Sequence, residues 1–506
     1  MLVNNKITGP TIFADWGDNI EVTVINNLRA NGTSIHWHGI HMKNTNLADG
    51  ANGVTECPVP PGRRKVYRFR ATQYGTSWYH SHFSAQYGNG VTGSILIYGP
   101  TSDNYDVDLG VFPISDYYYQ TADKIVEQVL HVPGAPSSDN VLFNGTAPHP
   151  VTGAGTRAVV TLQPNKKHKL RLINPSTENH FQLKLQNHSM TVVATDFVPV
   201  TPKTVDSLFL GVGQRYDVII DTTGKPAGSY WFNATFGGGG ACGLTLAGKP
   251  AAIFRYQGSP NVNPPNTINT EPADHNCLDD ISYSPVVSRT VPTTNFPVTD
   301  ANTLPIEFNF APNLLTWRVN GSAIDVNWNK PIAEYVLSGN TSYPEQHNVD
   351  IINGNSNTWV YWLIENDPEG TFSIPHPMHL HGHDYVVVGR SPPQAPGGPT
   401  HVFNPATDRG LLKANNPVRR DVVMLPAGGW MIMAFKLNNP GAWLMHCHIA
   451  WHVSGGLSNQ FLERRTDYLL QMALQPLEVI EFNQNCRAWR DYFPANAPFP
   501  KVDSGI

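Results

Sequence analysis

The chain has 506 residues, of which 14% are charged, and its formal net charge is −5. This balance gives no basic surface for nucleic acid, and we find no apolar run long enough to cross a membrane. Nucleic-acid binding and a membrane-spanning function are therefore excluded. The 43 glycines and 42 prolines favour many short strands joined by ordered loops over long helices.

Strand-like runs separated by Gly, Pro and Asn occur in three successive parts of the chain. The first part, residues 1–100, holds runs such as IEVTVINN and SILIYG. The second part, 101–290, holds KLRLIN and YDVIID, and a Pro/Asn/Thr-rich stretch over 259–300 is typical of a linker wrapped on the surface. The third part, 291–506, holds TWVYWLIEN and WMIMAFKL and ends in a polar tail. We therefore predict an all-β chain of three consecutive β-sandwich or barrel domains with these boundaries.

Ten histidines and one cysteine fall in four short clusters, two near each end of the chain. Because successive side chains of a strand point to opposite faces, both imidazoles of an H-x-H pair emerge on one face, within reach of one metal ion or a metal pair. A lone pair of this kind is more often a chance occurrence than a site, but four together are not. The clusters are His36-Trp37-His38, His80-Ser81-His82, His376-Pro377-Met378-His379-Leu380-His381 and His446-Cys447-His448-Ile449-Ala450-Trp451-His452.

The last cluster places a cysteine between two histidines. On a strand Cys447 faces one way, while His446 and His448 face the other, so one tripeptide bridges two metal sites through a few covalent bonds. Two histidines and one cysteine form the trigonal blue-copper pattern, which Cys447, His452 and the distant His376 can supply. The other eight histidines, as two pairs of opposing motifs from the first and third parts, can hold three further copper ions.

The remaining cysteines and the glycosylation sequons favour an extracellular protein. If Cys447 binds metal, four cysteines are left, which is enough for two disulfides, and the sequence alone allows three pairings. The start, MLVNNKITGPTIFADWGD, is typical of a strand and not of a signal peptide, so a secreted protein would have its targeting segment outside this chain. The four cysteines are Cys57, Cys242, Cys277 and Cys486, and the sequons lie at Asn31, Asn144, Asn187, Asn233, Asn320 and Asn340.

HWHG, HSH, HPMHLHG and HCHIAWH resemble, in this order, the four copper motifs of the multicopper oxidases. The similarity extends through ADGANGVTECPVPPG, TENHFQL, GQRYDV, LIENDPEGTF and NPGAWLMHCHIAWHVSGGL and covers nearly the whole chain. Within that family the chain is most similar to laccases of the ascomycete type, which share its Asp-Ser-Gly-Ile type of ending. The resemblance implies three cupredoxin-like Greek-key domains, in agreement with the three strand-rich parts. Family members usually begin some tens of residues earlier, so we expect a shortened first domain.

The resemblance also implies four copper ions, one of type 1, one of type 2 and two of type 3. Leu457 falls at the axial position of the type 1 copper, where leucine cannot coordinate, and the loss of a donor implies a high reduction potential. The ligands that match the family motifs are His376, Cys447 and His452 for type 1, His36 and His379 for type 2, and His38, His80, His82, His381, His446 and His448 for type 3.

Further roles come from the same resemblance. Glu178 matches the carboxylate that accepts the phenolic proton in the substrate pocket, and the less favoured alternative is a polar loop residue. Asp49 matches the acid near the type 2 copper that helps deliver protons, and the alternative is a residue of an Asp-Gly turn. Phe372, Ile374 and Trp451 are candidate apolar walls of the pocket, or core residues.

The resemblance implies two disulfides and a role for the end of the chain. The bridges of the family correspond to Cys57–Cys486 and Cys242–Cys277. In relatives with this ending, the last four residues enter the channel toward the trinuclear coppers. We therefore expect residues 503–506 to be a plug made by proteolytic trimming, whereas chain ends are more commonly frayed.

The predicted function is that of a laccase, which oxidises phenols and aryl amines by one electron at the type 1 copper and reduces dioxygen to water at the trinuclear copper cluster. One alternative is a metallo-oxidase such as a ferroxidase, which would need a cluster of acids beside His452 that the flanking segments lack. The other is a non-catalytic copper-binding relative, which would be expected to lose ligands, whereas all eleven are present. We expect a secreted, monomeric glycoprotein that takes part in lignin degradation.

Overall fold

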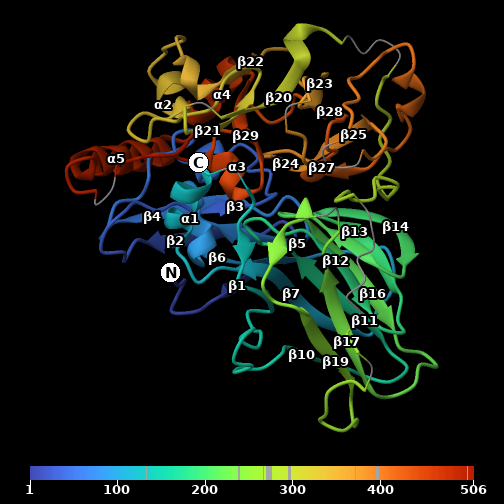
Figure 1. The fold of residues 1–506 in the computed structure, drawn as a ribbon. Helices are drawn as coiled ribbons and strands as arrows, with labels where there is room; N and C mark the ends of the chain where they lie inside the picture. The colour runs from blue at the N-terminus through green and yellow to red at the C-terminus, as the bar shows by residue number, and fades with distance from the viewer. Residues whose placement is uncertain are drawn as a thin grey trace.

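The computed structural model describes all residues except 133, 238–239, 266, 269–275, 294–297, 311, 371, 395–397 and 498–499. Strands dominate each part of the chain, and the all-β prediction is confirmed (Figure 1). Among the described residues, no helix combines the length and the apolar character needed to cross a membrane.

The first domain combines strands that alternate in exposure with strands that are buried on both faces. In the run NIEVTVI, exposed and partly buried residues follow one another with period two, which buries one face against the rest of the domain. One sheet has the order β1-β6-β5-β3, and β2 pairs with β4 in a second sheet. The strands are β1 (Gly9–Asp15), β2 (Asn19–Ile25), β3 (His36–Trp37), β4 (Arg64–Arg70), β5 (Gly75–His80) and β6 (Thr92–Tyr98).

The second domain is a sandwich of a five-stranded and a six-stranded sheet, in green at the lower right of Figure 1. Runs of Val, Ile, Leu and Phe are buried between the sheets, as a sandwich core requires. Its elements are β7 (Val107–Tyr117), α1 (Ala122–Val129), β8 (Ser137–Ser138), β9 (Asn140–Phe143), β10 (Val159–Leu162), β11 (Lys167–Ile173), β12 (Phe181–Leu185), β13 (Met190–Thr195), β14 (Val198–Val205), β15 (Leu208–Leu210), β16 (Arg215–Asp221), β17 (Ser229–Thr235), β18 (Leu244–Thr245) and β19 (Ala251–Tyr256).

The third domain again has two large sheets. Its elements are β20 (Thr303–Phe310), β21 (Leu315–Val319), α2 (Ile332–Leu337), β22 (Val349–Ile352), β23 (Trp359–Asn366), β24 (His376–Leu380), β25 (Tyr385–Arg390), β26 (Arg419–Arg420), β27 (Val422–Leu425), β28 (Trp430–Lys436), β29 (Gly441–Cys447), α3 (Ala450–Ser454) and β30 (Ser458–Glu463). The sheet orders are β21-β20-β23-β28-β25-β26 and β22-β30-β29-β24-β27.

The C-terminal region is helical, which the expectation of a polar tail missed. After β30 the chain forms α4 (Arg465–Ala473) and α5 (Pro476–Tyr492). Phe482, Cys486 and Trp489 are the buried residues of α5, and their spacing of four and three places them on one face of the helix. A proline in the first turn also favours a helix start. The polar character of this segment is that of a solvated helix face.

The paired sheets occupy residues 9–98, 107–256 and 303–463. This arrangement agrees with three consecutive β-domains, while the proposed boundaries near 100 and 290 stay predictions. The predicted linker over 259–300 lies partly outside the described residues. Within its described part Tyr283 and Val291 are buried, so this stretch packs against the domains at those points and does not only lie on the surface.

Candidate metal centre

Two strand pairings bring the four histidine motifs together. In the first domain β3 pairs with β5, and His36 stands opposite His80. In the third domain β24 pairs with β29, and His379 stands opposite His446. The eight imidazoles from these two pairs of motifs meet between the first and third domains. The ring centroids of His36 and His381, which come from different domains, are 3.8 Å apart.

Backbone carbonyl groups orient two of these imidazoles. Nδ1 of His36 donates a hydrogen bond to the carbonyl oxygen of Asp49 at 2.8 Å, and Nδ1 of His379 donates to that of Asp421 at 2.9 Å. In each ring the Nε2 atom then carries the free lone pair, and it has no hydrogen-bond partner in the described part of the chain. Such outer hydrogen bonds are the usual means of fixing the tautomer and direction of a metal-binding histidine.

Two buried carboxylates complete this outer layer. Oδ2 of Asp49 accepts a hydrogen bond from Nδ1 of His381 at 2.8 Å. Oδ1 of Asp421 accepts one from Nε2 of His38 at 3.1 Å, and the same carboxylate accepts two from the Arg215 guanidinium at 2.6 Å each. Asp421 and Arg215 were not predicted from the sequence, because nothing in the histidine motifs points to them.

The eight-histidine cluster suits metal ions. Nε2 of His80 and both ring nitrogens of His82 are buried without a hydrogen-bond partner, besides the Nε2 atoms of His36 and His379. Burial, reinforced by neighbouring imidazoles, lowers the pKa of His82, His379 and His381 well below the usual value, which keeps these rings neutral. Neutral, unpartnered imidazoles that face one another suit copper, zinc, iron and nickel. Within this cluster, the trios His36/His379/His381, His36/His38/His80 and His82/His381/His446 each have ligand atoms within 4.8 Å of one another.

A second donor set lies wholly in the third domain. Sγ of Cys447 is 3.6 Å from Nδ1 of His376 and 3.5 Å from Nδ1 of His452, and these two nitrogens are 3.2 Å apart. Burial raises the pKa of the Cys447 thiol well above its usual value, so a thiolate here needs a bound cation. Burial also lowers the pKa of His376 to about 3. His452 is 8% exposed, whereas His376 and Cys447 are 0% exposed, so His452 offers the edge nearest to solvent.

The Cys447 tripeptide joins the two donor sets, as the alternation of a strand predicts. While Cys447 faces His376 and His452, Nε2 of His446 lies 3.3 Å from Nε2 of His381. Nε2 of His448 lies 3.2 Å from Nδ1 of His38. Two covalent routes therefore lead from one sulfur atom to the eight-histidine cluster.

Apolar side chains surround the cysteine-containing set. Leu457 is fully buried, and its backbone binds both ligand segments, because its carbonyl accepts from Cys447 at 3.1 Å and its N–H donates to His452 at 3.0 Å. The ring of Trp317 lies 4.6 Å from that of His452 and 4.9 Å from that of His376. Trp317 was missed, because a tryptophan in a strand is more commonly a core residue.

Glu178 belongs to a loop that docks on α3. The carboxylate of Asp116 accepts hydrogen bonds from the N–H groups of Thr177, Glu178 and Asn179, and the carbonyl of Thr177 accepts from the N–H of Ala450. Oε2 of Glu178 is buried without a hydrogen-bond partner among the described residues. Burial first, and the charge of Asp116 second, raise the pKa of Glu178 to about 8.

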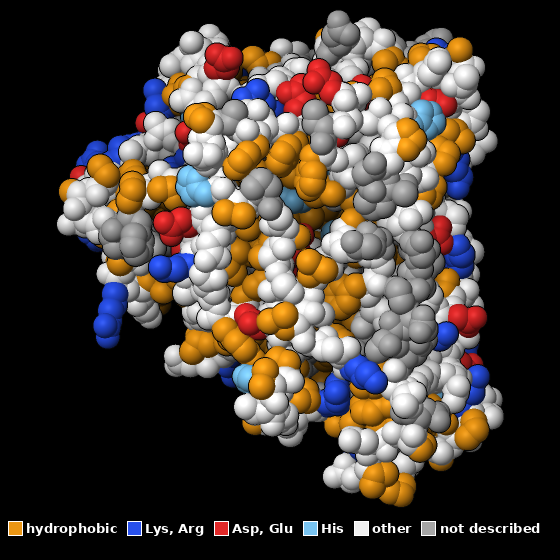
Figure 2. Space-filling model, viewed as in Figure 1, with side chains coloured by type: hydrophobic (Ala, Val, Ile, Leu, Met, Phe, Trp, Pro, Cys, Tyr) orange, Lys and Arg blue, Asp and Glu red, His pale blue; other side chains and the backbone are white. Residues whose placement is uncertain are grey.

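The three predicted pocket walls differ in exposure. Trp451 is 3% exposed, Ile374 is partly buried, and Phe372 is 40% exposed and packs near Trp317, with ring centroids 6.2 Å apart. Figure 2 shows hydrophobic side chains gathered in a hollow across the middle of one face, between the third domain above and the second below.

The structure contains both expected disulfides and a buried chain end. Cys57 is bonded to Cys486 and Cys242 to Cys277. Ser504 and Ile506 are 4% and 1% exposed. The N–H of Ser504 donates to the carbonyl of Ser454 at the end of α3, and the Trp328 indole donates to the carbonyl of Gly505, both within 2.9 Å. The end of the chain is thus fixed beside α3 (Figure 1).

The six sequons differ in accessibility. The side chains of Asn144, Asn187 and Asn320 are exposed, and those of Asn31 and Asn340 are partly exposed. Asn233, in contrast, is 1% exposed within β17, so a glycan there would have to be attached before the domain folds.

Comparisons with known proteins agree with this geometry. Family models of the multicopper oxidases match residues 1–102, 108–259 and 320–467. Laccase-2 of Podospora anserina is 63% identical over 510 residues, which cover all of this chain and 81% of that protein. The crystal structure of a laccase from Botrytis aclada has a TM-score of 0.89 and 37% identity, over 99% of this chain and 90% of that one. Fet3p, a multicopper oxidase that functions in iron import, covers 99% of this chain and 93% of its own with a TM-score of 0.84, but at 23% identity this shows a shared fold alone.

Proposed function

The chain belongs to the multicopper oxidase family, and from this premise we propose how its residues carry out the reaction of a laccase. It is an oxidoreductase with four copper ions, one of type 1, one of type 2 and two of type 3. When bound, these coppers would take one electron from each of four phenol molecules and supply the four electrons with which dioxygen, together with four protons, forms two water molecules. The observation that carries the proposal is the Cys447 tripeptide, which links a two-histidine, one-cysteine set to an eight-histidine cluster.

We assign the type 1 ligands by their separate donor set, and the type 2 and type 3 ligands by the resemblance of their motifs to those of the family. His376, Cys447 and His452 hold the type 1 copper, and His36 and His379 hold the type 2 copper. The type 3 pair is held by His38, His80, His82, His381, His446 and His448. This assignment is supported by the neutral, unpartnered nitrogens of the cluster and by the short distances between sulfur and nitrogen in the type 1 set.

Glu178 is the proposed proton acceptor for a phenol bound near His452. A phenol that loses an electron becomes a strong acid, so a nearby carboxylate that takes the proton favours the transfer. The raised pKa of Glu178 suits this task, because a stronger base holds the proton better. Phe372, Ile374 and Trp451 form the apolar walls that receive the aromatic ring, and Trp317 covers the type 1 histidines on the inner side.

Asp49 has two roles in this proposal. Its backbone carbonyl and its carboxylate orient His36 and His381, one from each domain. Because the carboxylate lies beside the eight-histidine cluster, it is also placed to pass protons there while dioxygen is reduced. Leu457 supplies no donor atom, which favours the reduced state of the type 1 copper and a high potential.

The remaining properties extend this proposal. Phenols and aryl amines, including fragments of lignin, are the proposed donors. Two disulfides and several exposed sequons support secretion as a glycoprotein, and the proposed oligomeric state is a monomer. The buried end, residues 503–506, is the proposed plug of the channel toward the cluster.

A spectrum and an oxygen electrode test this function together. A laccase shows the blue absorption of a copper–thiolate bond and consumes dioxygen with phenols and aryl amines. Faster turnover of Fe(II) than of any phenol would identify a metallo-oxidase instead, and blue absorption without dioxygen consumption would identify a non-catalytic copper protein. Ascorbate is the control donor, because its oxidation depends little on how well it fits the substrate pocket.

A further inference from the structure

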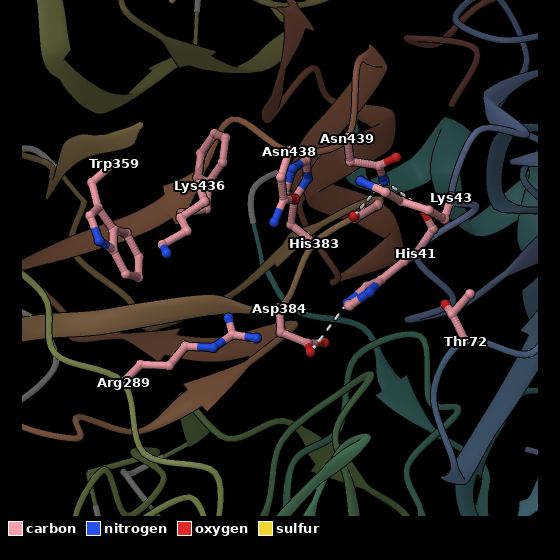
Figure 3. Close-up of a pocket in the computed structure, with 12 residues that line it drawn as sticks. His41, Lys43, Thr72, Arg289, Trp359, His383, Asp384, Lys436, Asn438 and Asn439 are labelled. Atoms are coloured by element: carbon pink, nitrogen blue, oxygen red, sulfur yellow. Dashed lines mark hydrogen bonds and ion pairs between the residues drawn. The ribbon is translucent and has the colours of Figure 1, made fainter. Parts of the chain in front are cut away.

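A second pocket lies next to the segment of the proposed type 3 ligand His381, because Gly382 and His383 are among its lining residues. It encloses about 200 Å³ where the first domain, the linker and the third domain meet (Figure 3). His41 and Lys43 come from the first domain, and Arg289 comes from the linker. The lining residues of the third domain are Trp359, Gly382, His383, Asp384, Phe435, Lys436, Asn438 and Asn439.

Three cations of this pocket have no acidic partner. In Figure 3 Lys43, Arg289 and Lys436 stand on different sides of the pocket. None of the three forms an ion pair within the described part of the chain, and the ammonium of Lys436 lies 5.2 Å from the centre of the Trp359 ring. The two nearest acids, Asp384 and Glu463, each lie closer to a histidine than to any of these cations.

The acids are held by histidines. Oδ2 of Asp384 lies 3.2 Å from Nε2 of His41, and Oε2 of Glu463 lies 3.0 Å from Nε2 of His383. Each acid therefore has its shortest charged contact with an imidazole, while the charge of Glu463 still acts on Lys43 and that of Asp384 on Arg289 from a longer distance. The pocket is locally positive although the whole chain carries a net charge of −5.

The positive charge extends behind the lining. Arg419 is 6% exposed, and burial, together with the charge of Arg289, lowers its pKa to about 10. Burial alone would raise the pKa of Asp384, but His41, Arg419 and Arg289 outweigh it and lower this pKa to about 2. The lowered pKa of Asp384 indicates positive charge around this carboxylate, whereas burial is the larger cause of the lowered pKa of Arg419.

We propose that this pocket binds a small oxyanion, held by Lys43, Arg289 and Lys436. Its volume is below the range of about 300–1,000 Å³ that is typical of sites for larger organic ligands, so the ligand is small. A guanidinium pairs two oxygens of one carboxylate or phosphate, and two ammonium groups add point charges. The Trp359 and Phe435 rings offer an apolar wall, which suits a carboxylate with a short hydrocarbon body.

Binding there would join parts that are distant in sequence. Nδ2 of Asn439 already ties the domains at this place, because it donates to the carbonyl groups of His41 at 2.6 Å and Gly382 at 2.9 Å. An anion would add a bridge from Lys43 in the first domain to Lys436 in the third. Because a ligand that binds the folded state alone stabilises it by mass action, the anion should raise the melting temperature in a saturable way.

Calorimetric titration and thermal melts of the copper-loaded full chain test the proposal. The probes are inorganic phosphate, sulfate and benzoate, each at constant ionic strength against sodium chloride. We expect one saturable site per chain and a melting temperature that follows the same curve. Tighter binding of benzoate would indicate an organic carboxylate as the ligand, and tighter binding of phosphate or sulfate would indicate an inorganic one.

Variants separate the site from general salt effects, since sulfate stabilises many proteins without binding. Arg289→Gln with Lys436→Gln should weaken binding at least tenfold. Arg64→Gln with Lys184→Gln removes the same charge from exposed positions elsewhere and should change nothing. Unchanged blue absorption shows that each variant is folded, and Lys43→Gln alone provides a milder second test. Equal binding by both double variants, or a shift that never saturates, would overturn the site.

Discussion

The two donor sets of this enzyme are built in opposite ways. The proposed type 1 set comes from β24, β29 and α3 of one domain, and its neighbours Leu457, Trp317 and Trp451 are largely apolar. The eight-histidine cluster is shared between two domains, and carboxylates hold its imidazoles from behind. We therefore expect the missing axial donor to determine the reduction potential of the first site. In the second site, we expect the hydrogen bonds from the histidines to the carboxylates to keep the ligands in position.

This difference predicts different kinds of sensitivity. A change beside the type 1 set should alter the potential or the choice of donor and leave the other coppers in place. A change in the outer layer of the cluster should alter dioxygen reduction or copper retention and leave the blue colour intact. A change at Cys447 should affect both regions, because its side chain lies in one donor set and its neighbours His446 and His448 lie in the other.

Cys447→Ser should have the largest effect. The thiolate is the proposed ligand and the start of both covalent routes, so blue absorption and the oxidation of every donor should fall below detection. Absorption spectra, copper analysis and an oxygen electrode measure this. Ser454→Ala, in the same region but without a proposed ligand role, is the control. Turnover of a phenol by the serine variant would contradict the electron route.

The sequence predicted which side chains gather, but not what holds them. The H-x-H spacing is local, so strand alternation alone places His36 with His38 and His446 with His448. Asp421 and Arg215 are distant from every motif, and only the packing of the second domain against the third brings Arg215 to Asp421. Trp317 is also distant from every motif. Its ring lies near His376 and His452 because of the position of strand β21 in the sheet of the third domain.

The helical end shows a different limit. The apolar residues of α5 lie on more than one face, since Leu477 and Ile480 are exposed, so its helical pattern is weak against the strand-rich chain before it. Its face of Phe482, Cys486 and Trp489 becomes evident once the disulfide from Cys57 fixes the helix on the first domain. Tertiary packing, and not local propensity, stabilises this element.

Asp49→Asn should have the next largest effect. The amide keeps the size of the side chain, but it can present its N–H₂ group to His381 and no longer carries a proton. Loss of such an outer partner typically costs about 10–100-fold in activity or metal affinity. Dioxygen consumption and type 2 and type 3 copper content should fall, while the blue band stays. Loss of the blue band together with dioxygen turnover would contradict the separation of the two regions.

Glu178→Gln should slow phenols and spare donors without an acidic proton. General-base catalysis contributes about 10²-fold or more, so kcat/KM for a phenol should fall by roughly that factor. Because the pKa of Glu178 is raised to about 8, the basic form increases as the pH rises toward that value. The wild type should therefore show a rise of kcat/KM with pH that the variant lacks. Ferrocyanide is the control donor, and an equal loss with ferrocyanide would exclude the proton-acceptor role.

Deletion of residues 503–506 should have a moderate effect. Ile506 is buried, and burial of such a side chain contributes about 1.5–3 kcal/mol, so the melting temperature should fall. If the tail is a plug, dioxygen kinetics or type 2 copper content should also change by a few-fold, while the blue band stays. Ile506→Ala keeps the backbone in place and separates lost packing from an opened channel. Unchanged dioxygen kinetics and copper content in the deletion would refute the plug.

Leu457→Met should have the smallest effect, and it is confined to the type 1 set. The two side chains have similar volume, so the exchange costs less than about 1.5 kcal/mol of stability. A thioether near the copper is a weak donor that favours the oxidised state, and the potential should fall. Phenols of high potential should then react several-fold more slowly, whereas donors of low potential and the eight-histidine cluster are unaffected. Redox titration of the blue band measures the shift, with Leu444→Met, another buried leucine of the domain, as the control. A potential that stays the same or rises would show that Leu457 is not at the axial position. The apolar surroundings of the type 1 set would then not account for its potential, whereas the role of the carboxylates at the eight-histidine cluster would be unaffected.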